Sequence, residues 1–226
     1  MCLSAILRLS PPPMPWPFPL PYCDPVLSLS DRCATCTDCA LSLTRRNLVY
    51  GRGPQGAQIM IVGDVPGERD DAVGQPFSGA AGELINKILE SADIDPIRDV
   101  YFCNLVKCRP AEYLGGPARA PSKEELKTCA KYLEDQIYFI KPAMVLAAGS
   151  LAAQSLLGLQ TPLSLIRGRW FDWKNGVRVM PIFHPTYLLH NDSKEPGSPK
   201  WSMWQDIKKV SAQINRGDKI TNGNQS

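Results

Sequence analysis

The chain alternates between short, continuous apolar runs and longer segments in which apolar residues recur every three or four positions. The first pattern is typical of buried strands, and the second of helices that pack on a sheet. The predicted strands cover residues 57–63, 99–106, 143–149, 168–173 and 177–183, and the predicted helices cover residues 79–93, 122–140, 150–158 and 199–215. Because strands and helices alternate, we expect an α/β protein with three α/β/α layers around a central, mostly parallel four-stranded sheet.

Local signals at the ends of these elements support the same order. Ser122 opens an S-x-x-E capping box, which starts a helix. The dipeptide Asn175-Gly176 is typical of a hairpin turn between the last two strands. Ser198 followed by Pro199 supplies an N-cap and a first-turn proline for the last helix.

The two ends of the chain differ in composition from the part between them. Residues 11–25 hold eight prolines in fifteen positions, which prevents both a helix and an interior strand. We expect residues 1–30 to be a Pro-rich leader, residues 31–216 to form one domain, and residues 217–226 to be a polar tail. The leader is more typical of a dispensable extension than of a docking motif. Arg8 and the prolines also argue against a signal peptide.

Composition and charge narrow the possible functions only slightly. The 226 residues are 44% hydrophobic and 21% charged, as in ordinary globular proteins. The net charge of +3 is small, so any surface that binds nucleic acid must be a local one. No apolar run approaches the length of about 18 residues that a membrane helix needs, so we expect no membrane partner.

The cysteines are unevenly distributed. Cys33, Cys36 and Cys39 lie close together, and Cys108 and Cys129 lie far downstream. Such clustered thiols are more typical of metal or cluster ligands than of disulfides, and their spacing suits either zinc or a [4Fe–4S] cluster. Cys33 forms a second C-x-x-C pair with Cys36, so the spacing leaves open which pair binds. Cys129 also suits a buried core position, because it lies near the apolar stripe of its helix.

A candidate ligand-binding loop follows the first strand. GDVPGERDDAVGQPF, at residues 63–77, begins at the carboxyl end of that strand, where ligands bind in open α/β sheets. Its glycines allow a close approach of the backbone to a ligand, its acids include Asp64 and Asp70, and Phe77 offers a flat face. These groups suit the hydrolysis of a planar heterocycle, and the alternative is a solvated acidic loop. By contrast, the G-x-G-x-x-G match at residues 51–56 precedes a strand and predicts only a turn.

Both histidines of the chain lie in the stretch FHPTYLLHN, at residues 183–191. Pro185 favours an extended conformation for His184 at the end of a strand. A buried, neutral imidazole there could donate a hydrogen bond to a developing oxyanion. The alternative is a purely structural histidine.

Several of these motifs occur together, in the same order, in one known family. The chain resembles the iron–sulfur (family four) uracil-DNA glycosylases of the uracil-DNA glycosylase superfamily over about residues 31–215. The resemblance rests on the segment 63–77, on NLVKCRP at 104–110, on HPTYLL at 184–189 and on EPGSPK at 195–200. It also rests on the spacing of twelve residues between Cys39 and Gly51.

The resemblance implies that the chain flips uracil out of DNA and hydrolyses its N-glycosidic bond, which starts base excision repair. It implies a [4Fe–4S] cluster, with zinc as the less favoured alternative. The implied cluster ligands are Cys36, Cys39, Cys108 and Cys129. It further implies a monomeric protein in the cytoplasm, associated with the nucleoid through DNA, with organelle targeting by the leader left open. A non-catalytic DNA-binding or damage-sensing module on the same fold is the alternative function.

The same resemblance implies roles in the substrate pocket. Phe77 would stack on the flipped uracil, and Asn104 would read its polar edge. Asp70 would position water or stabilise the cationic sugar, and His184 would lie near uracil O2. Asp64 and Val65 depart from the Glu and the Ala or Gly that are usual in the family beside the pocket, and many relatives carry Glu where this chain has Asp70.

Contacts with DNA complete the expected site. Leu188 and Leu189 are candidates for an apolar wedge that fills the space left by the flipped base. Lys107 and Arg109, beside Cys108, are the expected phosphate contacts. His190 matches no catalytic position and is expected to face DNA. Relatives that capture uracil-DNA covalently carry an extra histidine in the loop that corresponds to residues 109–121, and this chain has none there.

Overall fold

The computed structural model describes residues 30–31, 33–191 and 193–222, with only the backbone described from residue 216 onward. Apart from Ser30, the expected leader at residues 1–30 lies outside this part of the chain. The last helix continues to Asn222, beyond its expected end near Asn215 and into the expected polar tail.

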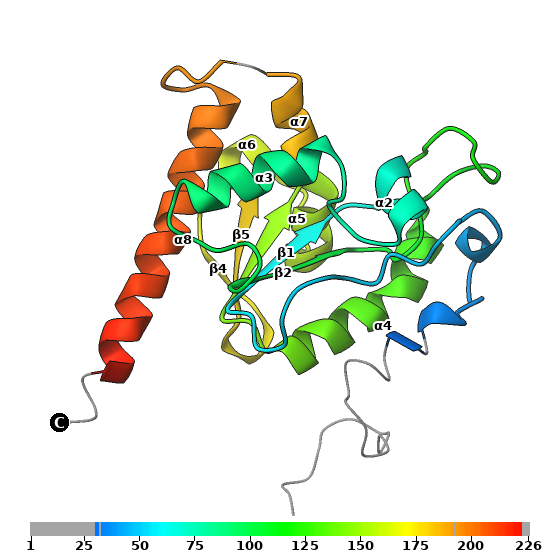
Figure 1. Cartoon of the computed structure of the whole chain (residues 1–226), viewed down its shortest axis with the longest axis horizontal. Coiled ribbons are helices and arrows are strands. Elements are labelled where there is room, and N and C mark those ends of the chain that lie inside the picture. Colours follow the sequence, from blue (N-terminus) through cyan, green and yellow to red (C-terminus); the bar gives the residue numbers. More distant parts are fainter. Residues whose placement is uncertain (1–29, 32, 192, 223–226) are drawn as a thin grey trace, which may run out of the picture.

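One sheet forms the centre of the molecule (Figure 1). Its strands are β1 (Ile59–Gly63), β2 (Val100–Asn104), β3 (Met144–Ala148), β4 (Phe171–Asp172) and β5 (Arg178–Ile182), in the order β2-β1-β3-β5-β4. All five predicted runs enter this sheet, so it has five strands and not the expected four. The first four strands in this order are parallel, as expected, and the two-residue β4 adds an antiparallel edge.

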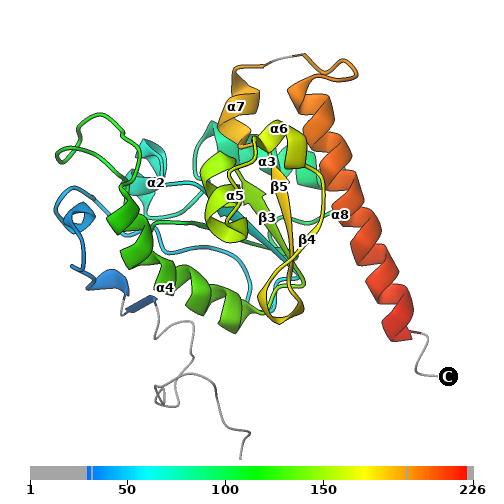
Figure 2. The same cartoon turned by 180° about the vertical axis from the view of Figure 1, so that it is seen from behind.

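Helices cover both faces of the sheet (Figures 1 and 2). The helices are α2 (Glu68–Val73), α3 (Ala80–Glu90), α4 (Lys123–Ile140), α5 (Ser150–Leu157), α6 (Leu163–Ile166), α7 (Pro185–Leu189) and α8 (Pro199–Asn222), with short 3-10 turns η1 (Ala40–Leu43) and η2 (Lys174–Gly176). Ile59 and Ile61 of β1 pack on the side of α3, α7 and α8. Met60 and Val62 pack on the side of α4, α5 and α6. This alternation makes the three layers of an α/β/α fold, as predicted.

The predicted signals act at the ends of the elements. The side chain of Ser122 accepts a hydrogen bond from the backbone N–H of Glu125, and the Glu125 carboxylate accepts one from the backbone N–H of Ser122, so the capping box starts α4. Asn175 and Gly176 both have positive φ angles, of 56° and 77°, in the hairpin between β4 and β5. Pro199 is the first residue of α8.

The register of the parallel strands brings the separate motifs to one edge of the sheet. Gly63 at the end of β1 pairs with Asn104 at the end of β2 and with Ala148 at the end of β3. Ala148 in turn pairs with Ile182, two residues before His184. Segments that are far apart in the sequence therefore meet at the carboxyl edge of the sheet, where ligands bind in open α/β folds. Among the helices in the described residues, none is long and apolar enough to cross a membrane.

Candidate active site and cysteine cavity

Gly63 allows two side chains to close over the end of β1. A Cβ atom at this position would collide with Asn104 Oδ1 and would lie 3.0 Å from the Phe77 ring. Any other residue would therefore push the amide and the aromatic ring away from the backbone. The glycine is needed here for space, as the sequence predicted for a close approach.

Phe77 is held in an unusual backbone conformation. Its φ angle is 54°, which a phenylalanine rarely adopts, and its side chain is 8% exposed. Its ring centroid lies 5.4 Å from that of Phe102 and 6.2 Å from that of His184, with an angle of 24° between the Phe77 and His184 rings. Gly82 has no side chain to obstruct the carbonyl of Phe77. The surroundings thus fix the orientation of the ring, and strained backbone of this kind is common at functional sites.

Asn104 is a buried amide with an unused donor. Its side chain is 2% exposed, and no described residue accepts a hydrogen bond from its Nδ2. Its backbone carbonyl accepts a hydrogen bond of 2.6 Å from Lys107 Nζ, which fixes the chain at the end of β2. A buried polar atom without a partner costs free energy, so an unpaired amide beside Phe77 indicates a place for a polar ligand.

The environment of His184 determines where its proton lies. Nδ1 accepts a hydrogen bond of 3.2 Å from the backbone N–H of Thr186, because His184 caps the first turn of α7. Burial lowers the pKa of His184, and the nearby charge of Asp70 offsets this only in part. The neutral ring therefore carries its proton on Nε2, where it can donate a hydrogen bond to a ligand.

Asp70 is fixed by backbone donors on both of its oxygens. Oδ2 accepts from the N–H of Gly67 at 3.1 Å, and Oδ1 accepts from the N–H of Ser78 at 2.7 Å. The first bond belongs to the cap of α2, and the second ties α2 to the turn that carries Phe77. The position of this carboxylate is thus coupled to the position of the aromatic ring.

Asp64 and Val65 point elsewhere. Asp64 Oδ1 accepts a hydrogen bond of 2.7 Å from the N–H of Ala152, in the first turn of α5. Burial raises the pKa of Asp64 to about 6, although backbone donors from Ala152 and Leu151 lower it. Val65 packs against the hydrophobic cluster that contains the cysteines. Neither side chain joins the group formed by Phe77, Asn104 and His184, so their expected contact with a substrate stays a prediction.

Three of the expected DNA contacts are contradicted by burial. Lys107 is 0% exposed, and its Nζ donates to Asn104 and to Gln136 Oε1, both at 2.6 Å. Arg109 is 6% exposed and donates to the carbonyl of Gly116. Leu188 is 0% exposed, because the stretch after His184 is the short helix α7, whose inner face packs in the core. None of these three side chains can reach a bound duplex from its position here.

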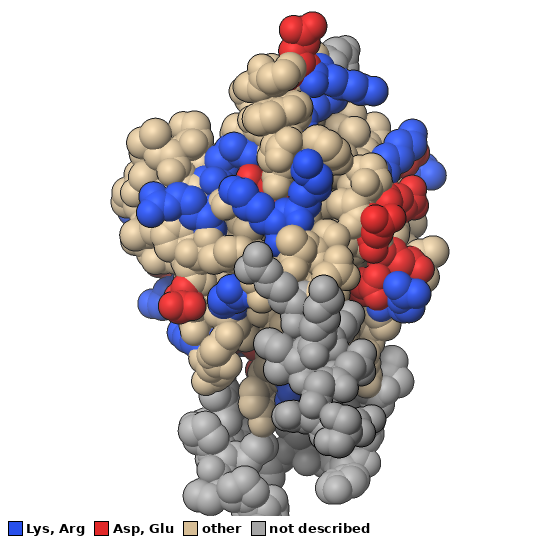
Figure 3. Space-filling view, turned by 90° about the vertical axis from the view of Figure 1, so that its left-hand side faces the viewer, with Lys and Arg blue, Asp and Glu red and all other residues tan. Residues whose placement is uncertain are grey.

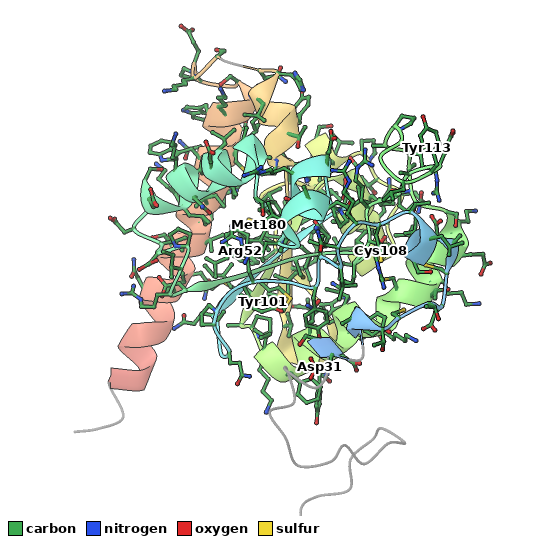
Figure 4. All side chains as sticks on the ribbon, turned by 45° about the vertical axis from the view of Figure 1, so that its right-hand side comes forward. Asp31, Arg52, Tyr101, Cys108, Tyr113 and Met180 are labelled. Atoms are coloured by element: carbon green, nitrogen blue, oxygen red, sulfur yellow. The ribbon has the colours of Figure 1, made fainter. Side chains whose placement is uncertain are left out.

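Other side chains do reach solvent near this edge. On α7, Tyr187 and Leu189 are 48% and 37% exposed, so of the expected wedge only Leu189 keeps its place on the surface. Tyr113 lies at the tip of the loop that follows Arg109 and points away from the sheet (Figure 4). Arg69 and Arg52 line an open hollow of about 360 Å³ that also contains Phe77.

The five clustered cysteines lie around one cavity, here called the cysteine cavity. Its thiols are those of Cys33, Cys36, Cys39, Cys108 and Cys129. Cys108 lies where the segment after β2 meets the N-terminal half of α4 and the segment around η1 (Figure 4). Three separate stretches of chain therefore contribute thiols to the same place. In the described residues, no three histidine, cysteine or acidic side chains converge closely enough to hold a single metal ion.

Hydrogen-bond donors surround these sulfurs. Arg45 Nη1 donates to Cys108 Sγ at 3.1 Å, and the backbone N–H of Lys107 donates to Cys129 Sγ at 3.3 Å. Burial raises the pKa of Cys108 to about 11, although Arg45 lowers it, and burial raises the pKa of Cys33 to about 12. Buried thiols with N–H donors are the surroundings that iron–sulfur clusters use.

A buried carboxylate links the cysteine cavity to the candidate active site. Asp71, beside Asp70 in α2, is 3% exposed. Its Oδ1 accepts hydrogen bonds from the backbone N–H groups of Arg46 at 2.9 Å and Asn47 at 3.3 Å. The segment that follows the first three cysteines is thus fastened to the helix that carries Asp70. The sequence alone does not reveal this role of Asp71, because its partners Arg46 and Asn47 lie 25 and 24 residues earlier in the chain.

The fold and this site define an α/β protein with a preformed place for a planar, polar ligand at the carboxyl edge of the sheet. Comparison with known proteins makes the class specific. Residues 50–208 match the family model of the uracil DNA glycosylase superfamily. The chain belongs to this superfamily and, within it, to the type-4 uracil-DNA glycosylases.

Individual relatives support the assignment. A type-4 uracil-DNA glycosylase of Thermotoga maritima is 40% identical over 168 residues, which are 74% of this chain and 84% of the relative. The corresponding protein of Archaeoglobus fulgidus is 36% identical over 69% of this chain and 79% of its own length. That of Saccharolobus solfataricus is 32% identical over 72% and 76%.

Proposed function

We propose that this chain excises uracil from DNA by hydrolysing the N-glycosidic bond. The observation that carries the proposal is the buried Asn104 amide, whose Nδ2 has no partner among the described residues and which lies against Gly63 beside Phe77. Proteins named type-4 uracil-DNA glycosylases align with 74% and 69% of the chain at 40% and 36% identity. The name uracil site is used below for five residues: Gly63, Asp70, Phe77, Asn104 and His184.

Recognition of uracil follows from the groups that this site offers. The Asn104 amide has one donor and one acceptor, which match O4 and N3–H of uracil. The flat face of Phe77 can stack on the base, and a stacked base is typically worth about 1–3 kcal/mol. Gly63 leaves room for the base to approach the end of β1. A glycosylase must flip its target out of the duplex to reach such a buried site, at a cost of a few kcal/mol.

The same groups can stabilise the breaking of the bond. As the bond between C1′ and N1 lengthens, negative charge develops on uracil O2 and positive charge on the sugar. Nε2–H of the neutral His184 can donate to O2, and the loss of one such donor typically costs about 3 kcal/mol of barrier. Asp70 lies within electrostatic range of His184. Its fixed carboxylate can stabilise the sugar cation and orient the attacking water.

Leu189 is the proposed wedge. It is exposed as the last residue of α7, the helix that His184 caps, whereas Leu188 anchors the same helix in the core. An apolar side chain at this place can fill the gap that the flipped base leaves in the stack. The exposed Tyr187 lies on the same short helix and can extend this apolar contact.

Positive charge for the phosphates must come from side chains that reach solvent. Arg69, exposed on α2 in the hollow beside Phe77, is the proposed replacement for the buried Lys107 and Arg109. A further gathering of Lys and Arg covers the middle of the face that carries α8 (Figure 3). The net charge of the chain is only +3, so these local surfaces provide the electrostatic attraction for DNA.

The cysteine cavity is the proposed site of a [4Fe–4S] cluster, held by Cys36, Cys39, Cys108 and Cys129. The thiols and the N–H donors around them suit such a cluster. Zinc, the alternative, draws four ligands to about 2.3 Å from one ion, whereas each thiol of a cluster binds a different iron. The family resemblance favours the cluster over zinc. A bound cluster would cross-link the three segments that line the cavity.

One assay tests the proposed function. The purified protein is incubated with duplexes that contain U:G or U:A pairs and with single-stranded DNA that contains uracil, and abasic product is measured. We expect product from at least one substrate and a severe loss of it in Asp70→Ala and Asn104→Ala proteins that remain folded. Strong duplex binding without abasic product would instead support the non-catalytic DNA-binding alternative. The protein is further proposed to act as a monomer in the cytoplasm, where its DNA lies.

A further inference from the structure

The cysteine cavity contains one thiol more than a [4Fe–4S] cluster needs. Cys33 lines it together with the four proposed ligands, and it is the most buried of the five, at 1% exposed. Cys36 and Cys39 are only partly buried. The family resemblance leaves Cys33 without a role, so its place among the ligands requires an explanation of its own.

Cys33 lies next to Cys36 along the chain and in space. The two residues stand at the ends of one hydrogen-bonded turn, in which the N–H of Cys36 donates to the carbonyl of Cys33 at 3.0 Å. Residues three apart in such a turn lie on the same side of the chain. Cys33 therefore faces the same cavity from one turn earlier, and the C-x-x-C spacing of Cys36 and Cys39 is repeated by Cys33 and Cys36.

Cys33 is also close to the distant ligands. It belongs to the same buried cluster as Cys108 and Cys129, with Cys36 packed against that cluster, so it meets thiols from all three segments around the cavity. By contrast, the sixth described cysteine, Cys103, packs in the hydrophobic cluster on the α4 side of the sheet. Cys33 is thus a member of the ligand group by position and not merely another core thiol.

The segment that carries Cys33 and Cys36 has less regular structure than the other ligand segments. Neither residue lies in a strand, and Cys36 stands in an irregular stretch before η1. Cys129 is fixed in the long helix α4, and Cys108 follows β2 within a fully buried stretch. A small rotation of the turn at residues 33–36 would exchange one thiol for the other, while the rest of the cavity keeps its place.

We propose that Cys33 is a reserve ligand of the cluster, able to take the coordination position of Cys36. This inference rests on the proposed cluster. It implies that the chain still has four cysteine ligands after the loss of Cys36. The N-terminal segment could then bind the cluster through either Cys36 and Cys39 or Cys33 and Cys39. A ligand exchange of this kind needs no oxidant or reductant, because one thiolate replaces another and the proton passes from the incoming thiol to the outgoing one.

The test compares Cys36→Ser, Cys33→Ser, the double variant and Cys129→Ser, all in the full chain and purified without oxygen. Iron, acid-labile sulfide and visible absorption are measured per folded chain. We expect Cys33→Ser and Cys36→Ser each to keep more than half of the wild-type iron, and the double variant to keep roughly a tenth or less. Cys129→Ser is the matched control, because α4 holds no second cysteine, and it should lose the cluster.

The electron paramagnetic resonance spectrum of the reduced cluster supplies a second readout. It should differ between Cys36→Ser and the wild type, because a different turn of the chain then holds the iron, and it should be unchanged in Cys33→Ser. If Cys36→Ser loses iron as completely as the double variant, folded or not, the proposal is wrong. If the wild-type protein itself contains no iron and sulfide, the proposed cluster fails, and that outcome is distinct from the failure of Cys33 alone.

Discussion

The uracil site and the cysteine cavity are joined through α2, yet they are built in different ways. The uracil site lies at the ends of strands and in capped turns, and backbone groups fix its side chains, as at Asp70 and His184. The cysteine cavity takes three of its five thiols from a segment whose described residues form no more than short helical turns. The first site is therefore ready for its ligand, whereas the proposed cluster would hold the second together.

The largest expected effect tests the chemistry of the uracil site. His184→Ala removes the proposed donor to uracil O2, and we expect single-turnover excision to fall by about 10²–10³-fold. The melting temperature should change little, because α7 stays anchored by Leu188. His190→Ala is the matched control, since His190 is exposed at the end of α7. Wild-type rates in His184→Ala would remove His184 from the proposed mechanism.

Loss of the proposed cluster should destabilise the cysteine cavity more than it lowers the activity of the uracil site. Cys108→Ser removes a ligand that also accepts a hydrogen bond from Arg45. We expect the segment at residues 33–47 to become sensitive to protease, and the melting temperature to fall by about 4–8 °C, which corresponds to about 2 kcal/mol in a domain of this size. Excision should be reduced but still measurable. If Cys108→Ser instead loses excision as fully as His184→Ala and keeps the wild-type melting temperature, the cysteine cavity does not act mainly on stability, and the proposed difference between the two regions is wrong.

The same difference explains which features could be predicted from the sequence. Gly63, Phe77 and His184 were singled out from strand ends and local motifs, and Asn104 from the family resemblance. The parallel register brings the ends of their strands together. The burial of Lys107 could not be predicted in this way. Its partner Gln136 lies 29 residues further along the chain in α4, so only the packed structure shows that the lysine points inward.

Short elements were also difficult to predict. No helix was predicted at Leu188-Leu189, but the five residues of α7 form one, so that one leucine faces the core and the other faces solvent. Five residues are too few for a helical period to be recognised in the sequence. The run at residues 168–173 was predicted as a strand, although the sheet was expected to have only four strands. The strand it forms, β4, is shorter than predicted, with two residues.

The two leucines provide a matched pair that separates stability from DNA contact. Leu188→Ala should lower the free energy of unfolding by about 2–5 kcal/mol, because it empties a fully buried position. Leu189→Ala should leave stability within about 0.5 kcal/mol of the wild type. It should slow excision from duplex DNA more than from single strands, where no stack has to be filled. Thermal unfolding and excision rates on both substrates measure these effects, and equal behaviour of the two variants would refute the assignment.

A second pair separates a structural cation from a DNA-binding one. Lys107→Met leaves the Asn104 carbonyl and Gln136 Oε1 without their donor, so we expect a loss of about 1–3 kcal/mol of stability. It should not change the salt dependence of DNA binding. Arg69→Gln should keep the stability and lower the slope of log K against log salt by about 0.9 for one lost phosphate contact. If Lys107→Met lowers this slope and Arg69→Gln does not, Lys107 contacts DNA and Arg69 does not.

A last comparison concerns Asp64, which lies in the loop of the uracil site but accepts a hydrogen bond from the first turn of α5. Its pKa is raised from 3.8 to about 6 in the folded protein, chiefly by burial, so the folded state binds this proton more tightly than the unfolded state does. The stability that protonation provides is complete below pH 4 and is lost as the pH rises to about 6. Asp64→Asn has no such titration. Its unfolding free energy relative to the wild type should therefore rise between these pH values, by at most about 3 kcal/mol.

The rate of uracil excision by Asp64→Asn then shows whether Asp64 has a structural role or contacts the substrate. If the side chain only holds α5, Asp64→Asn should excise uracil at close to the wild-type rate, because its amide oxygen can still accept the hydrogen bond from Ala152. A loss of more than about tenfold, with no change in the pH dependence of stability, would place Asp64 in the substrate pocket, where the family resemblance put it. Chemical denaturation at pH 4 and pH 7, with single-turnover rates at pH 7, separates the two outcomes. If Asp64 only holds α5, the loop after β1 contains one acid that acts in the proposed reaction, Asp70, and one that stabilises the fold, Asp64.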